Sequence, residues 1–90
     1  METTISSPKH FNPETVIEYQ TRLDGPVELI VYNLSGKKVR ELVNGVRPAG
    51  NYEARWNGTD DWGNRVSSGM YIYRLKSGNF MQAKKMVLLQ

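Results

Sequence analysis

Residues 56–75 read Trp-Asn-Gly-Thr-Asp-Asp-Trp-Gly-Asn-Arg-Val-Ser-Ser-Gly-Met-Tyr-Ile-Tyr-Arg-Leu, and this stretch decides the fold class. It places a polar turn, rich in Gly and Asp, between two extended segments that are rich in aromatic residues. A turn of this kind between two strands predicts a β-domain with ordered loops. The stretch contains no His, no Cys and no Ser-His-Asp set, so it favours recognition over catalysis.

Alternation of apolar and polar residues extends outward from this stretch in both directions. Strands are predicted over residues 15–23, 27–33, 38–43, 51–56, 70–76 and 80–89, with a bulge or bend in 38–43. The faces expected to be buried carry Ile17, Tyr19, Thr21 and Leu23 in the first strand, Tyr52, Ala54 and Trp56 in the fourth, and Tyr71, Tyr73 and Leu75 in the fifth. Turn signals recur about every 8–12 residues, which predicts an all-β, antiparallel β-sandwich of about seven short strands. A small barrel also fits the spacing, although we favour the sandwich.

The length and charge of the chain limit the kinds of function that it can have. Ninety residues form one domain, and we expect residues 1–13 to be a linker or tail and residues 14–90 to be the sandwich. With no cysteine, the fold depends on packing and strand hydrogen bonds without disulfides. The net charge of +3 is mild and dispersed, which argues against nucleic-acid binding, and no apolar run suits direct membrane insertion. The first residues also lack the pattern of a signal peptide.

Five glycines are expected to shape the turns: Gly36, Gly50, Gly58, Gly63 and Gly69. The loop from Asn57 to Asn64 is rich in oxygen donors, but its spacing does not match the EF-hand calcium loop. We therefore favour Asx-type hydrogen bonds from side chain to backbone, with calcium binding left open.

No residue set predicts catalysis or a cofactor. His10 is the single histidine and lies in the polar N-terminal segment without a partner nucleophile. Asp60 and Asp61 are adjacent, so in an extended segment their carboxylates would point apart instead of converging. We therefore expect neither enzymatic activity nor a bound cofactor or metal.

Aromatic residues and the last strand are the remaining candidates for recognition. Trp56, Trp62, Tyr71 and Tyr73 would stack on sugars if they were exposed in line, but we expect all except Trp62 to fill the core. The terminal run Lys84, Lys85, Met86, Val87, Leu88 and Leu89 is β-prone. At a sheet edge its backbone would pair with another chain, whereas an interior position would make it purely structural, and both possibilities stay open.

Several motifs in order resemble a known family. Pro8-Lys9-His10-Phe11-Asn12-Pro13-Glu14-Thr15 is similar to the lead-in of the C-terminal sorting domains of the type IX (Por) secretion system. The similarity continues through Val31-Tyr32-Asn33-Leu34-Ser35-Gly36-Lys37-Lys38-Val39, Pro48-Ala49-Gly50, Trp56-Asn57-Gly58, Asp60-Asp61 with Gly63-Asn64, Ser68-Gly69-Met70-Tyr71 and Lys85-Met86-Val87-Leu88-Leu89. The same pattern resembles the Ig-like domain of flagellar hook-capping proteins. Lys9 and His10 depart from the usual Pro-Asn-Pro lead-in.

The resemblance implies an appended, non-catalytic module with an Ig-like sandwich fold. It implies that the module directs a larger exported protein through the type IX outer-membrane translocon to the cell surface or medium, by way of the periplasm. The implied partners are translocon components and an upstream catalytic or adhesin domain, and Lys84 to Leu89 would supply the recognition edge. The alternatives are an Ig-like assembly domain of flagellar hook-cap type and a carbohydrate-binding module.

Overall fold

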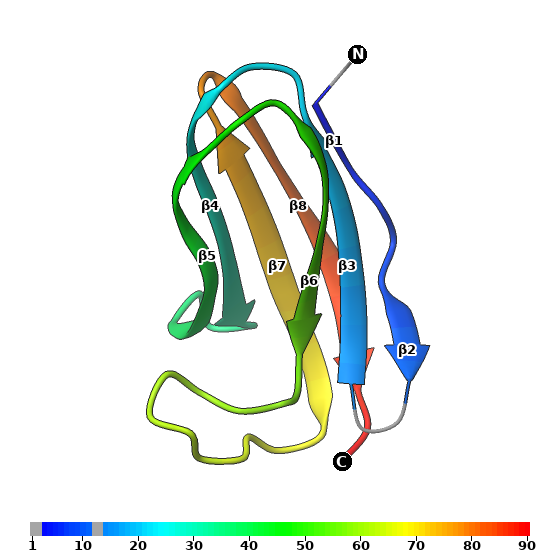
Figure 1. Ribbon diagram of the computed structural model, residues 1–90. Coiled ribbons are helices and arrows are strands. Elements are labelled where there is room, and N and C mark those ends of the chain that lie inside the picture. Colours follow the sequence, from blue (N-terminus) through cyan, green and yellow to red (C-terminus); the bar gives the residue numbers. More distant parts are fainter. Residues whose placement is uncertain (1–2, 12–13) are drawn as a thin grey trace.

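The chain folds into two antiparallel β-sheets that face each other (Figure 1). The structure, a computed structural model, describes residues 3–11 and 14–90; for residues 9–11 it describes the backbone alone. No helix long and apolar enough to cross a membrane occurs among these residues. The predicted all-β sandwich is confirmed, with eight strands in the described part of the chain, two of which are only two and three residues long.

Sheet A is built around β3 (Glu14–Thr21). Strand β6 (Gly50–Trp56) pairs with β3 along almost its whole length, from Thr15↔Trp56 to Thr21↔Gly50. Strands β1 (Thr4–Ile5) and β2 (Lys9–Phe11) therefore share the opposite edge of β3, with Ile5 beside Tyr19 and His10 beside Thr15.

Sheet B has the order β5-β4-β7-β8. It consists of β4 (Gly25–Asn33), β5 (Lys38–Arg47), β7 (Gly69–Ser77) and β8 (Phe80–Leu88). The predicted irregularity is confirmed, because the register between β4 and β5 shifts at Leu29/Ile30 and again at Val31/Tyr32. The predicted strands 70–76 and 80–89 are joined by a hairpin, in which Ser77 pairs with Phe80.

The core lies between the sheets and is lined by alternate residues of each strand, as period-2 patterning requires. Its largest fully buried side chains belong to Trp56, Tyr73, Ile17, Leu29 and Leu75. Trp56 packs edge-on against Tyr71, with ring centroids 5.2 Å apart. Aromatic pairs in this geometry contribute about 0.5–1.5 kcal/mol beyond the area that they bury.

The structure corrects three predictions. Leu23 is exposed instead of buried, because β3 ends at Thr21 and the chain then turns toward the other sheet. Strand β5 extends to Arg47, beyond the predicted range 38–43, and its residues Asn44 and Gly45 pair with Glu28 and Val27. Part of the segment predicted as a linker joins sheet A as β1 and β2, and Ile5 is buried in the core.

Candidate functional site

The predicted recognition run, Lys84 to Leu89, covers the end of β8 and the residue after it, and β8 is the last strand of sheet B. Within the described chain no strand pairs with its outer side, so the edge position that the sequence left open is the one found. Met86 and Leu88 point into the core and are buried, whereas Lys85, Val87 and Leu89 are exposed. A partner at this edge would therefore meet backbone N–H and C=O groups together with Lys85 and Val87.

Gln90 fixes the chain just after β8. Its Nε2 atom donates hydrogen bonds to the carbonyl oxygens of Gly58, at 3.0 Å, and Val66, at 2.8 Å, and its backbone N–H donates to Ser68 Oγ at 2.9 Å. The loop between β6 and β7 and the end of β8 are thus joined in one hydrogen-bonded unit.

Asp60 organises the loop that the sequence singled out. Its Oδ1 atom accepts hydrogen bonds from the backbone N–H groups of Trp62, at 3.0 Å, and Asn64, at 2.9 Å. The backbone N–H of Asp60 in turn donates to the Asn64 carbonyl at 2.8 Å. This is the Asx-type arrangement that was predicted, and it uses the oxygen that a cation would otherwise take.

Asp61 points away from Asp60 and holds the loop against β5. Its Oδ1 atom accepts a 2.9 Å hydrogen bond from the backbone N–H of Glu41. Arg40 supports the same contact, because its Nη1 atom donates to Thr59 Oγ1 at 2.9 Å and to the Asp60 carbonyl at 3.0 Å. The two carboxylates engage different groups, so they form no acid–base pair. The part of the chain that the structure describes holds no group of three or more His, Cys, Asp or Glu residues suited to a metal ion.

The aromatic residues are divided between the core and the surface as predicted. Trp56, Tyr71 and Tyr73 are buried, and Trp62 is 83% exposed on the loop. Trp56 Nε1 donates a 2.8 Å hydrogen bond to the Thr59 carbonyl, and the Tyr71 hydroxyl donates one of 2.6 Å to the Ser67 carbonyl. These residues fill the core, so they form no exposed row on which a sugar would stack.

Two tyrosine hydroxyls have perturbed acidity, and both perturbations come from packing. Burial raises the pKa of Tyr73 to about 12, and burial is also the largest cause of the raised pKa of Tyr19. A phenol with a raised pKa stays protonated at neutral pH, so no phenolate forms there to act as a base. His10 lies in β2, and its side chain falls outside the described part of the structure.

The glycines predicted at turns occupy several kinds of position. Gly36, Gly58, Gly63 and Gly69 have positive φ angles, from +78° to +151°. Gly50 begins β6 instead. Gly58, with φ of +78°, carries a second constraint, because a Cβ atom there would lie 2.7 Å from Gln90 Nε2.

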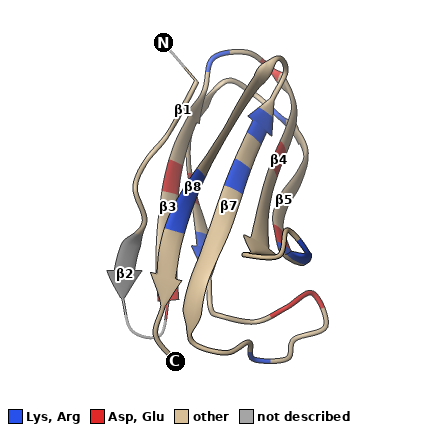
Figure 2. Ribbon diagram, turned by 180° about the vertical axis from the view of Figure 1, so that it is seen from behind, with Lys and Arg blue, Asp and Glu red and all other residues tan. Residues whose placement is uncertain are grey.

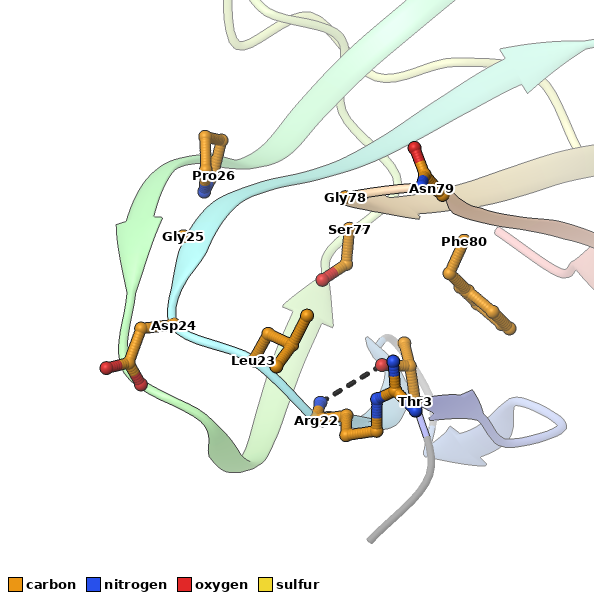
Figure 3. Close-up of a pocket in the computed structure, with 10 residues that line it drawn as sticks. All are labelled: Thr3, Arg22, Leu23, Asp24, Gly25, Pro26, Ser77, Gly78, Asn79 and Phe80. Carbon is orange, nitrogen blue, oxygen red and sulfur yellow. Dashed lines mark hydrogen bonds between the residues drawn. The ribbon is translucent and has the colours of Figure 1, made fainter.

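A pocket of about 470 Å³ opens at the end of the sandwich where the β3–β4 connection meets the β7–β8 turn (Figure 3). Leu23, Pro26 and Phe80 supply apolar surface there. Thr3 Oγ1 accepts a 3.0 Å hydrogen bond from the backbone N–H of Arg22, and Asp24, the one carboxylate of the lining, accepts a 2.7 Å bond from the backbone N–H of Ala49. These polar groups hold the chain in place, and among the residues that the structure describes no base or nucleophile converges on the pocket.

Sequence reasoning missed two arginines that organise surfaces of sheet B. Arg40 docks the loop onto β5, and Arg74 lies over the ring of Tyr32, 5.1 Å from its centroid. The register of β4 with β7 would have found the second contact, because it places Arg74 beside Ile30, two residues from Tyr32 on the same face.

Comparison with known proteins agrees with this architecture. The family model of the FlgD Ig-like domain matches residues 6–79, which is most of the chain and includes every strand from β2 to β7. No curated protein matches the chain. The matched family is structural and non-catalytic, which agrees with carboxylates that do not converge and with an aromatic core. This chain belongs to the FlgD Ig-like domain family.

Proposed function

We propose that this chain is a non-catalytic assembly domain of flagellar hook-cap type, which binds other protein subunits as part of a larger protein. The match to the FlgD Ig-like domain over residues 6–79 carries the proposal. The geometry supports it, because the carboxylates of the loop and the pocket, Asp60, Asp61 and Asp24, accept hydrogen bonds that hold the fold. What remains available for recognition is the surface of the sheets and the edge of β8.

Domain replacement tests this function directly. The Ig-like domain of a flagellar hook-capping protein would be exchanged for this chain, and hooks would be counted by electron microscopy. The matched controls are the same protein without an Ig-like domain and the same protein carrying an unrelated β-sandwich. We expect hook formation well above both controls; formation no better than with the unrelated sandwich would contradict the proposal.

Secretion sorting is a second candidate, and the end of the chain supports it. The motifs that resemble type IX sorting domains continue past the matched range into Lys85-Met86-Val87-Leu88-Leu89, and all of these residues except Leu89 lie on the edge strand β8. Under this proposal the chain would take an exported parent protein to the cell surface or the medium. The outer-membrane translocon would be its partner, and a catalytic or adhesin domain would precede it.

Export of a reporter separates the two candidates. A reporter with a signal peptide and this chain at its C-terminus would be produced in a bacterium that has a type IX system. Sorting predicts that the reporter appears outside the cell, and that removing residues 84–90 leaves it in the periplasm. Equal export with and without these residues would exclude Lys84 to Leu89 as the recognition edge.

A further inference from the structure

Charge is unevenly divided along the chain. All nine acidic residues precede residue 62, so the β7–β8 hairpin contains no carboxylate. The hairpin carries four cations, which are Arg74, Lys76, Lys84 and Lys85. Viewed from the side of sheet B, Lys and Arg mark β7 and β8, and neither strand carries Asp or Glu (Figure 2). The hairpin is therefore a cationic element in a domain of only mild net charge.

Cations and apolar side chains alternate on the outward face of this hairpin. Because Tyr71, Tyr73 and Leu75 point into the core, the residues between them face outward. The outward residues pair across the two strands as Met70↔Val87, Ile72↔Lys85 and Lys76↔Met81. Met70 is 42% exposed, Val87 44% and Met81 61%. We call these outward residues of β7 and β8, together with Arg74, the hairpin face.

Arg74 is held in place at the centre of the hairpin face. Its guanidinium lies over the Tyr32 ring, 5.1 Å from the centroid, and its Nη2 atom is 3.8 Å from Glu28 Oε1. At that distance the two side chains form an ion pair but no hydrogen bond. Its Nε atom is buried and has no hydrogen-bond partner in the described part of the chain. The Tyr32 ring thus positions the Arg74 guanidinium by stacking, while the Nε–H group of Arg74 donates no hydrogen bond within the described part of the chain.

The lysines of the hairpin face form no ion pairs. Neither Lys76 nor Lys85 has an ion-pair partner among the residues that the structure describes, although Glu28 of β4 lies beside Lys76 in the register and is paired with Arg74. On the outer face of sheet A the situation is the reverse, since Arg55 pairs with Glu14 at 3.2 Å and with Glu53 at 2.9 Å. The hairpin face therefore presents two lysines without an ion-pair partner in the described part of the chain, next to Arg74.

We propose that the hairpin face is a docking surface for an acidic, amphipathic protein segment. Carboxylates of the partner would pair with Arg74, Lys76 and Lys85, while its apolar side chains would cover Met70 and Val87. Tyr, Met and Arg are enriched in the cores of protein interfaces, and complementary charge fixes the orientation of a partner. A polyanion alone would leave the exposed apolar pair uncovered, which is why a protein segment fits better. The inference rests on the proposed assembly function, and it names the surface through which the domain would bind another subunit.

The test is a binding titration followed by NMR on the isotope-labelled full chain. The probe is a short synthetic peptide in which Glu alternates with Leu. The same peptide with Gln in place of Glu tests the charge, and poly-glutamate tests the apolar contribution. A single-stranded DNA oligonucleotide and phosphatidylglycerol vesicles test the two other classes of anionic partner. We expect the Glu–Leu peptide to bind most tightly and to shift the resonances of residues on the hairpin face.

Matched variants locate the site. Lys76→Glu with Lys85→Glu should weaken binding of the Glu–Leu peptide by at least about tenfold, since loss of one good contact is worth about 1.4 kcal/mol. Arg22→Glu with Lys37→Glu makes the same change in net charge on exposed residues elsewhere and should retain binding within about twofold. Val87→Ser should weaken binding, whereas Val46→Ser, at an exposed position of β5, should not.

Four outcomes would overturn the inference: no binding of the Glu–Leu peptide, equal loss in both double variants, equal affinity for poly-glutamate, or tighter binding of DNA or vesicles. None of these results would affect the hook-assembly experiment, which reads a different property. If hook assembly failed while the peptide still bound, the proposed function would be rejected and the docking surface would remain supported.

Discussion

The hydroxyl of Tyr73 donates a 2.6 Å hydrogen bond to the backbone carbonyl of Ser6, although the two residues are 67 positions apart. Tyr73 lies in the middle of β7 in sheet B, and Ser6 follows β1 at the edge of sheet A. The bond crosses the core and ties the N-terminal segment to the opposite sheet. It gives that segment a fixed position which neither of its very short strands would secure alone.

Removing this hydroxyl should destabilise the domain measurably. Tyr73→Phe keeps the ring but leaves the Ser6 carbonyl without its donor, so we expect a loss of about 1–3 kcal/mol in the free energy of unfolding. Urea denaturation measures it. Tyr32→Phe is the control, because Tyr32 is only half-buried and its ring still supports Arg74; its change should stay within about 0.5 kcal/mol. Equal losses in both variants would contradict a specific role for the bond.

Alkaline pH should weaken the fold through the same tyrosine. Burial raises the pKa of Tyr73 from 10.0 to about 12 in the folded protein. The folded state therefore keeps the proton that the unfolded state releases, so the stabilising contribution is present below pH 10 and is lost as pH rises toward 12. Denaturation midpoints between these pH values should fall for the wild type and fall less for Tyr73→Phe. A parallel fall in both proteins would assign the effect to other groups, such as Tyr19.

The two tryptophans should have clearly different fluorescence. Trp56 is fully buried, whereas Trp62 is 83% exposed. Trp62→Phe should leave blue-shifted emission that acrylamide quenches poorly, and it should change stability by less than about 0.5 kcal/mol. Trp56→Leu should leave red-shifted, readily quenched emission and cost several kcal/mol, about 3–5 by analogy with large core truncations. Strong quenching in the Trp62→Phe protein would contradict the buried position of Trp56.

Asp60 should act as a hydrogen-bond acceptor and not as a calcium ligand. Asp60→Ala removes the acceptor of two backbone N–H groups and should cost about 1–3 kcal/mol. Asp60→Asn keeps an oxygen at the same place and should retain most of the stability. Thermal unfolding with added calcium or with EDTA should give the same midpoint for the wild type. A thermal unfolding midpoint that rises with calcium would instead support the calcium site that the sequence left open.

Gly58 and Gly36 offer a matched pair for separating backbone strain from crowding. Both have positive φ, +78° and +84°, but a Cβ atom at Gly36 meets nothing within 4 Å. Gly36→Ala should cost about 1 kcal/mol from strain alone, and Gly58→Ala should cost more because the new methyl group displaces Gln90 Nε2. Urea denaturation in a Gln90→Ala background should bring the two costs together. A difference that persists without Gln90 would contradict this account.

Much of the fold could be predicted because alternation is a local property. Tyr73 and Trp56 belong to strands in which buried positions alternate with positions that are not buried, so their burial follows from the pattern alone. The same logic failed for Leu23, since period-2 patterning does not show where a strand ends. It also missed β1 and β2, which are too short to show a period and form only because β3 presents a free edge to them.

The candidate recognition surface was harder to predict for a different reason. The β-prone run at 84–89 was visible, but whether it lies at an edge depends on the order of strands in the sheet. The contacts of Arg40 with the loop and of Arg74 with Tyr32 join residues at least 19 positions apart. Such contacts follow from register and topology, which a single sequence does not encode locally.

The chain enters the sandwich at one end, where β1 begins, and leaves it at the other, where β8 ends (Figure 1). Tension between neighbouring parts of a larger protein would then run parallel to the strand axes, and the ladders would have to slide instead of peeling open one rung at a time. The β7–β8 ladder, with nine residue pairs, would break many backbone bonds together, whereas β1, with two pairs, would detach first. Single-molecule stretching would register a small early step, the release of β1, followed by a larger rupture of the sheet B ladder.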